Sequence, residues 1–191
     1  TKAAAGGKIY AEYCAACHGA NGQAFAPQEG LPQTECLKPG ESEDIYGPIV
    51  GKITRIEDIA TDRRRLDSFS YALAVNMGTP YAGTPYRFCH YRKTFGYANM
   101  PLDGLWLRAP YLHNGSVPTL RDLLDVGDQR PKEFYRGNDV YDPIKVGFVS
   151  TIAEEGGRKY FRFDTEIPGN GTGGHEGKSY GTELSADEKD A

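Results

Sequence analysis

Five residues near the start of the chain have types and a spacing suited to covalent chemistry. Cys14-Ala15-Ala16-Cys17-His18 is a C-x-x-C-H run, the pattern of a c-type haem attachment site. Two thiols one helical turn apart can each form a thioether to one edge of the same porphyrin. The adjoining imidazole is then held under the iron as its proximal ligand. The run therefore predicts a covalent haem c, with Cys14 and Cys17 as anchors and His18 as an iron ligand.

Two other kinds of site use a C-x-x-C pair, a redox dithiol and a zinc site. A thioredoxin-like dithiol follows a hydrophobic strand, whereas residues 3–13 read as a short helix. A zinc site needs a second close ligand pair, whereas Cys36 and Cys89 are single and far apart. Haem attachment is therefore the favoured interpretation.

The element that must position this motif is a helix predicted over residues 3–17. Gly6, Tyr10 and Cys14 share one face of that helix, and glycines at 19 and 22 let the chain turn away beneath the ring. The segment resembles the N-terminal helix and haem-binding turn of the cytochrome c fold. In that family a C-terminal helix crosses the first helix at its small residue, so the resemblance implies a close crossing at Gly6.

Further along the chain the elements are short. We predict a loop over 19–50, an amphipathic stretch over 53–60, a solvated turn or helix start at 62–67 and a helix over 68–77. Residues 78–99 read as a packed loop beside the haem. A helix begins near Thr119, strands over 145–152 and 158–163 form a hairpin around 154–157, and Ser185 with Glu188 forms a capping box.

We therefore expect one domain over 1–191, mainly α, with a cytochrome c-like fold, long loop insertions and a small β-hairpin. Its parts are a haem-binding helix at 1–22, an insertion at 23–96 and a family-like region at 97–191.

Composition excludes some partners and favours others. The 191 residues carry a net charge of −4 and are 39% hydrophobic, with 24 Gly and 12 Pro. Nucleic acid is an unfavourable partner for such a chain, and no apolar run approaches the roughly 20 residues that span a bilayer. The sequence starts at Thr1 without a visible signal peptide, which fits a mature bacterial protein in the periplasm or outside the cell. Protein redox partners are expected.

Two cysteines remain after the motif takes its pair. In an oxidising compartment Cys36 and Cys89 are expected to form a disulfide. It would close a long loop, which contributes about 4 kcal/mol in the chain-entropy picture. The alternative is two separate buried thiols.

The residue facing His18 across the iron decides what the site can do. The candidates are Met77, Met100, His90, His113 and His175. In the cytochrome c fold the sixth ligand lies on the loop before the last helix, which favours His175 in the glycine-rich segment 173–177. Met100, in Asn-Met-Pro, is the alternative, followed by Met77 or an open site. His90 reads as structural, and Met77 as a core residue at a helix end.

A second resemblance covers the latter half of the chain. Residues 100–124 resemble the C-terminal cytochrome domain of the di-haem cytochrome c peroxidase and rubber oxygenase group, with further matches at 130–131, 134–137, 141–143, 146–148, 163–165 and 168–170. In rubber oxygenases that haem looks bis-histidine, with a distal Gly-His like Gly174-His175, which implies His175 here. The methionine ligand of the peroxidases is missing from residues 124–128.

Those enzymes carry two C-x-x-C-H motifs and this chain has one, so it looks like the electron-transferring domain alone. We expect an extracytoplasmic monohaem c-type cytochrome that passes single electrons between redox partners. The alternatives are a peroxidase or oxygenase with an open distal site, and an electron-transfer subunit of a larger redox complex. The loop at 110–115 either lines the haem edge, with Trp106, Arg108 and Tyr111 beside the cofactor, or is a packed turn.

Overall fold

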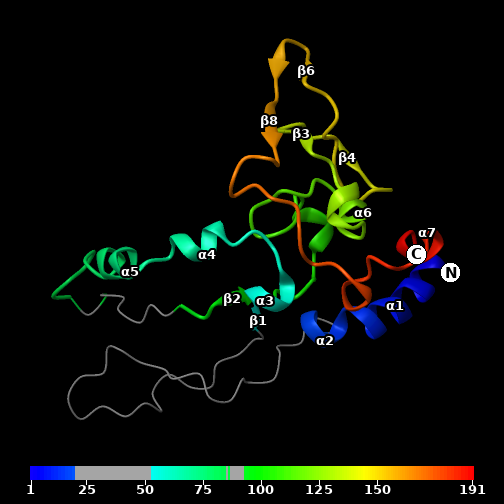
Figure 1. The fold of residues 1–191 in the computed structure, drawn as a ribbon. Helices are drawn as coiled ribbons and strands as arrows, with labels where there is room; N and C mark the ends of the chain where they lie inside the picture. Colours follow the sequence, from blue (N-terminus) through cyan, green and yellow to red (C-terminus); the bar gives the residue numbers. More distant parts are fainter. Residues whose placement is uncertain (20–52, 85, 87–92) are drawn as a thin grey trace.

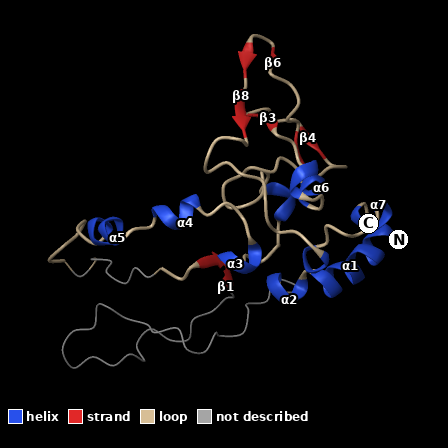
Figure 2. Cartoon of the chain, viewed as in Figure 1, coloured by secondary structure: helices blue, strands red, loops and turns tan. Residues whose placement is uncertain are grey.

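The computed structural model describes residues 1–19, 53–84, 86 and 93–191. It shows an N-terminal helix, short helices and small paired strands, joined by extended loops (Figures 1 and 2). The helices are α1 (Lys2–Tyr13), α2 (Ala15–His18), α3 (Ile56–Ile59), α4 (Arg64–Ser68), α5 (Tyr71–Met77), α6 (Leu120–Leu123) and α7 (Ala186–Lys189), and the 3₁₀ turns are η2 (Leu105–Leu107), η3 (Gly127–Gln129) and η4 (Lys178–Tyr180). Because the helices after α1 are short, the structure supports the predicted mainly α architecture only loosely.

The strands form antiparallel pairs rather than one sheet. In the described part, β1 (Ile53–Arg55) pairs with β2 (Gly96–Ala98), β3 (Glu133–Arg136) with β8 (Phe161–Asp164), β4 (Tyr141–Asp142) with β5 (Gly147–Phe148), and β6 (Glu154–Glu155) with β7 (Arg158–Lys159). The predicted hairpin around 154–157 is confirmed as β6 and β7. The predicted strands 145–152 and 158–163 are wrong as mutual partners. Phe163 stacks on Phe134 at a centroid distance of 5.0 Å, so β8 joins β3.

The N-terminal helix stops before the motif instead of running through it. Thr1 Oγ1 caps α1 by accepting from Ala4 N, and Cys14, with φ −111° and ψ −39°, lies between α1 and α2. The single helix predicted over 3–17 is therefore two helices, because the backbone at Cys14 departs from helical geometry. The Tyr10 hydroxyl donates to the Gly19 carbonyl, 2.6 Å away, and fastens the end of α2 back to α1.

The C-terminal segment lies against this first helix, as Figure 1 shows for α1 and α7. The predicted capping box is confirmed: Ser185 N donates to the Glu188 carboxylate at 2.9 Å, and Ser185 Oγ accepts from Glu188 N. A Cβ atom at Gly6 would lie 2.6 Å from the carbonyl oxygen of Ala191. The close approach expected at Gly6 is therefore present.

Helices α4 and α5 form an arm that extends away from the rest of the chain (Figure 1). Arg63 and Asp67 pair at 2.8 Å on the solvated start of α4, and Ser70 caps α5. The expectation that Met77 is a core residue is wrong, because its side chain is 41% exposed on this arm. Tyr81 and Phe95 are also exposed, whereas Tyr97 of β2 stacks on His113, so among the described residues of 78–99 the expected packing is found only near the end of the loop.

The buried apolar core is small and lies mostly in the second half of the chain. Four apolar side chains are buried there, those of Tyr111, Val117, Phe134 and Phe163. Two more are buried earlier in the chain, those of Ile56 and Leu66. A modest core of this kind fits a fold that a macrocycle helps to complete. Among the described residues, no helix combines the length and apolar character needed to cross a membrane.

Candidate haem site

The motif residues lie together at the short helix α2. Cys14 ends α1, and Cys17 and His18 lie one turn further on, with Gly19 turning the chain away at φ 73°. No disulfide joins Cys14 to Cys17. Burial, and next the neighbouring Cys17, raise the pKa of the Cys14 thiol. Reactive redox dithiols have lowered pKa values, so this arrangement favours covalent anchoring over thiol–disulfide exchange.

His18 is oriented by a main-chain carbonyl. Its Nδ1 donates to the carbonyl oxygen of Met100 at 2.8 Å. A carbonyl can only accept, so this bond requires the proton on Nδ1 and leaves Nε2 as the free lone pair. Histidine ligands of metals are oriented in this way by a bond from their other nitrogen.

The segment that carries Met100 also contacts the motif through Asn99. Asn99 Nδ2 donates to the Cys17 carbonyl at 3.0 Å, and its Oδ1 accepts from Thr54 Oγ1 at 2.7 Å. The Asn-Met-Pro run was considered for its sulfur alone. In the structure the Met100 carbonyl and the Asn99 side chain contact the motif instead. The Met100 side chain is 58% exposed.

His175 lies on a glycine-rich strap, which we define as residues 169–175. A Cβ at Gly174, whose φ is +80°, would collide with the main chain of Ala60 and Thr61, so only glycine fits there. His175 itself has a left-handed φ of 54°, a costly conformation that surrounding contacts must hold. Its N–H donates to the Ile59 carbonyl at 2.8 Å.

The imidazoles of His18 and His175 lie close together, with ring centroids 6.4 Å apart and ring planes tilted by 48°. Two metal–imidazole bonds of about 2 Å each, with about 1 Å from each nitrogen to its ring centre, span about 6 Å. His175 Nδ1 is buried and has no hydrogen-bond partner among the described residues. Buried polar atoms are normally bonded, so an atom of this kind indicates that a group from outside the chain binds here. The ring pair therefore fits a haem iron between its members.

Electrostatics keep His175 in the form that binds metals. Burial, followed by the charges of His18 and Arg130, lowers its pKa to about 4. The imidazole is therefore neutral near pH 7, as a ligand must be. Tyr180 lies beside the ring, with a centroid distance of 4.8 Å.

Trp106, Arg108 and Tyr111 each contact groups of the protein near their own loop. Trp106 meets the Tyr141 ring edge-on at 6.0 Å, and Arg108 Nη1 donates to the Pro101 carbonyl at 3.1 Å. The buried Tyr111 hydroxyl bonds the carbonyls of Leu105 and Val146, and burial raises its pKa to about 12. In the described chain, no contact joins these three side chains to His18 or His175, so their role at the cofactor stays a prediction.

The remaining predicted residues divide into two groups. Cys36, Cys89 and His90 lie outside the described residues, so the predicted disulfide stays a prediction. His113 stacks on Tyr97, with centroids 4.1 Å apart and its ring half-buried, which places it in a packed turn rather than opposite His18. Its neighbour Asn114 donates to the carbonyls of Gly169 and Gly171 on the strap, a role that sequence reasoning missed.

Comparisons with known proteins agree with this geometry in both halves of the chain. Residues 3–74 match the cytochrome c family, and residues 96–136 match the family described as RoxA-like, cytochrome c-like. The first match contains the C-x-x-C-H motif. The second contains the Asn-Met-Pro segment that holds His18 and the loop that holds the strap.

Two proteins of Sinorhizobium fredii are similar over part of their length. The one named Uncharacterized protein y4iJ is 49% identical over 80 residues, which is 42% of this chain and 13% of that protein. The one named Uncharacterized protein y4iM is 56% identical over 61 residues, which is 32% of this chain and 14% of that protein. The chain thus spans a small fraction of the length of the curated relatives it matches.

Proposed function

Because this chain is a c-type cytochrome with covalently bound haem c, we propose that it is a monohaem electron carrier whose iron ligands are His18 and His175. The observation that carries the proposal is the 6.4 Å spacing of the two imidazoles. When bound, the haem supplies an iron centre that accepts and releases one electron.

The chain's own residues provide attachment and orientation. Cys14 and Cys17 fix one edge of the ring, and the Met100 carbonyl holds His18 through Nδ1 so that Nε2 points to the metal. The neutral, buried His175 closes the opposite side. If His18 and His175 both hold the iron, they would leave no position there for a substrate, which supports an electron carrier over a peroxidase or oxygenase.

The class of c-type cytochromes also suggests the partners of this protein and its compartment. Cytochrome c domains exchange electrons with other proteins, and we propose protein redox partners on that basis. The net charge of −4 favours a partner with a basic docking face. We also propose an exported location, periplasmic or extracellular, because covalent haem attachment in bacteria accompanies export.

The test is spectroscopic and uses the intact holo-protein. Its mass should exceed that of the polypeptide by one haem, and EPR with near-infrared MCD of the oxidised form should show low-spin bis-histidine iron. His175→Ala should convert it to a high-spin form that binds CO rapidly once reduced. Met100→Leu, which keeps the carbonyl that holds His18, is the matched control and should leave the spectrum unchanged. A high-spin wild-type protein, or a methionine–iron signature, would overturn the proposal.

A further inference from the structure

Arg130 is a buried guanidinium whose hydrogen bonds all go to main-chain carbonyls. It is 2% exposed. Nε donates to Asp125 O at 2.9 Å, Nη1 to Thr172 O and to Gly174 O at 2.9 Å, and Nη2 to Leu123 O at 3.1 Å and to His175 O at 3.3 Å. Arginine has five N–H donors, and each of them has a carbonyl here. A buried cation bonded in this way holds two backbone segments together.

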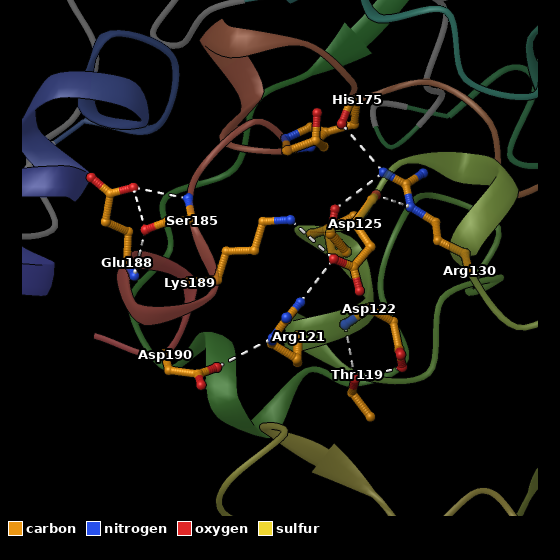
Figure 3. A network of polar contacts seen from close by, with 12 residues as sticks. Thr119, Arg121, Asp122, Asp125, Arg130, His175, Ser185, Glu188, Lys189 and Asp190 are labelled. Atoms are coloured by element: carbon orange, nitrogen blue, oxygen red, sulfur yellow. Dashed lines mark hydrogen bonds and ion pairs between the residues drawn. The ribbon is translucent and has the colours of Figure 1, made fainter.

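Resting on the proposed function, we propose that Arg130 is the positioning residue that holds His175 opposite His18. Three of its partner carbonyls belong to the strap, including that of His175 itself, and the other two follow α6 or lie at its end (Figure 3). The planar fork of a guanidinium suits several converging acceptors, whereas a lysine ammonium has three donors. The side chain thus acts on the ligand through the main chain.

The strap needs such a clamp because its backbone is strained. Gly174 and His175 both have left-handed φ values, of 80° and 54°. The carbonyls of Thr172, Gly174 and His175 all point toward Arg130. A helix or a sheet could not supply hydrogen-bond donors to carbonyls arranged in this way. The bonds from Arg130 replace those that a helix or sheet would supply, and they fix the turn that directs the imidazole.

The buried cation keeps its charge without a carboxylate bonded to it. Burial lowers the pKa of Arg130, and the nearby Glu176 and Asp125 partly oppose that effect. The Asp125 carboxylate is bonded instead to Arg121 at 2.8 Å and to Lys189 at 3.0 Å. An arginine guanidinium stays protonated in proteins, so the positive charge of Arg130 remains beside the strap, where it would favour reduced over oxidised iron.

The same network joins the clamp to the helix that carries the motif. Asp125 bonds Lys189 of α7, and Arg121 bonds Asp190 at 3.2 Å (Figure 3). The chain beyond α7 lies against Gly6 of α1. The strap and the C-x-x-C-H helix are therefore tied to a common body, so a clamp on the strap sets its position relative to His18.

The test measures how readily cyanide displaces His175 from the oxidised holo-protein. Arg130→Met removes the charge and all five bonds, and we expect cyanide to bind at least about ten-fold more tightly, since one charged hydrogen bond contributes about 1.5 kcal/mol or more. Arg130→Lys should give an intermediate affinity and a partial rescue. Arg136→Met is the control, because Arg136 is a partly buried arginine that lies over the Phe163 ring, 4.7 Å from its centroid.

Two further readouts separate positioning from general structure. Added imidazole should restore the low-spin spectrum of Arg130→Met, and the reduction potential of Arg130→Met should fall while that of Arg130→Lys stays closer to wild type. If Arg130→Met does not fold, Arg130→Lys carries the cyanide test. If His175→Ala binds cyanide as wild type does, the proposed function fails; if His175→Ala differs but neither Arg130 variant does, only the positioning role is overturned.

Discussion

Gly6 of α1 lies against the main chain of Ala191, so closely that a Cβ atom at Gly6 would be 2.6 Å from the Ala191 carbonyl oxygen. This approach seats the C-terminal segment on the helix that leads to the haem motif. A side chain of any size at this position must separate the two segments. A Cβ atom at the neighbouring Gly7 would have no such contact within 4 Å. The two glycines therefore differ in packing although they share one helix.

Gly6→Ala should therefore destabilise the protein, by about 1–3 kcal/mol for an overpacked contact. Gly7→Ala is the matched control and should stabilise it by about 0.5–1 kcal/mol, because alanine loses less backbone freedom in a helix. Thermal unfolding of the two holo-variants measures both changes. Equal shifts for the two variants would show that the contact with Ala191 contributes nothing.

Asn99 joins the segment that holds His18 to the motif itself. Asn99→Ala removes its bond to the Cys17 carbonyl and leaves Thr54 Oγ1 without its acceptor. We expect a loss of about 1–3 kcal/mol in the free energy of unfolding. Denaturant unfolding followed by haem absorbance measures it. Thr54→Val, which removes only one of the two bonds, is the control and should cost less; a larger loss for Thr54→Val would contradict this role of Asn99.

Local patterns predicted the local parts of this structure. The C-x-x-C-H spacing, the Ser185–Glu188 capping box and the turn at 154–157 each depend on residues within one helical turn or one hairpin, and the two structural features among them are present as expected. The close approach at Gly6 was expected from the resemblance of the first segment to the cytochrome c fold. These signals need no knowledge of distant segments.

Long-range relationships were the ones that sequence patterns could not supply. A helix was predicted over 68–77, but not that Leu73, Val75 and Met77 on it would be exposed. The partner of β8 is set by Phe134, a residue far away in the chain. Arg130 bonds backbone carbonyls only, and such bonds leave no pattern of residue types. Its role in the candidate site was therefore missed.

His113 makes stability depend on pH in a definite direction. Burial, and next the charge of Arg65, lower its pKa below the usual 6.5, and its Nε2 is buried without a hydrogen-bond partner in the described part. The unfolded chain therefore takes up a proton more readily than the folded protein. The stabilisation is fully present above about pH 6.5 and is lost as the pH falls below it, by at most about 1.4 kcal/mol per pH unit.

The measurement is the free energy of unfolding of wild type and His113→Phe at pH 7.5 and at about pH 5. Phenylalanine keeps a ring against Tyr97, and it cannot titrate. The wild-type protein should lose more stability than the variant between these two conditions. Identical losses would mean that His113 is no more protected from protons in the folded protein than in the unfolded chain.

Asn114 holds the first part of the strap, as Arg130 holds the second. Its Nδ2 donates to Gly169 O at 3.1 Å and to Gly171 O at 2.9 Å, and its Oδ1 accepts from Ser116 N at 3.2 Å. Asn114→Ala leaves the Gly169 carbonyl without this donor and the Gly171 carbonyl with only its bond from Ser116 Oγ, which should cost about 1–3 kcal/mol of stability. Ser116→Ala removes a single bond to Gly171 and should cost less. Hydrogen exchange of the strap amides should rise more in Asn114→Ala than in Ser116→Ala, because the first variant removes two side-chain bonds to strap carbonyls and the second removes one. Unchanged exchange in Asn114→Ala would show that the strap is held without this side chain.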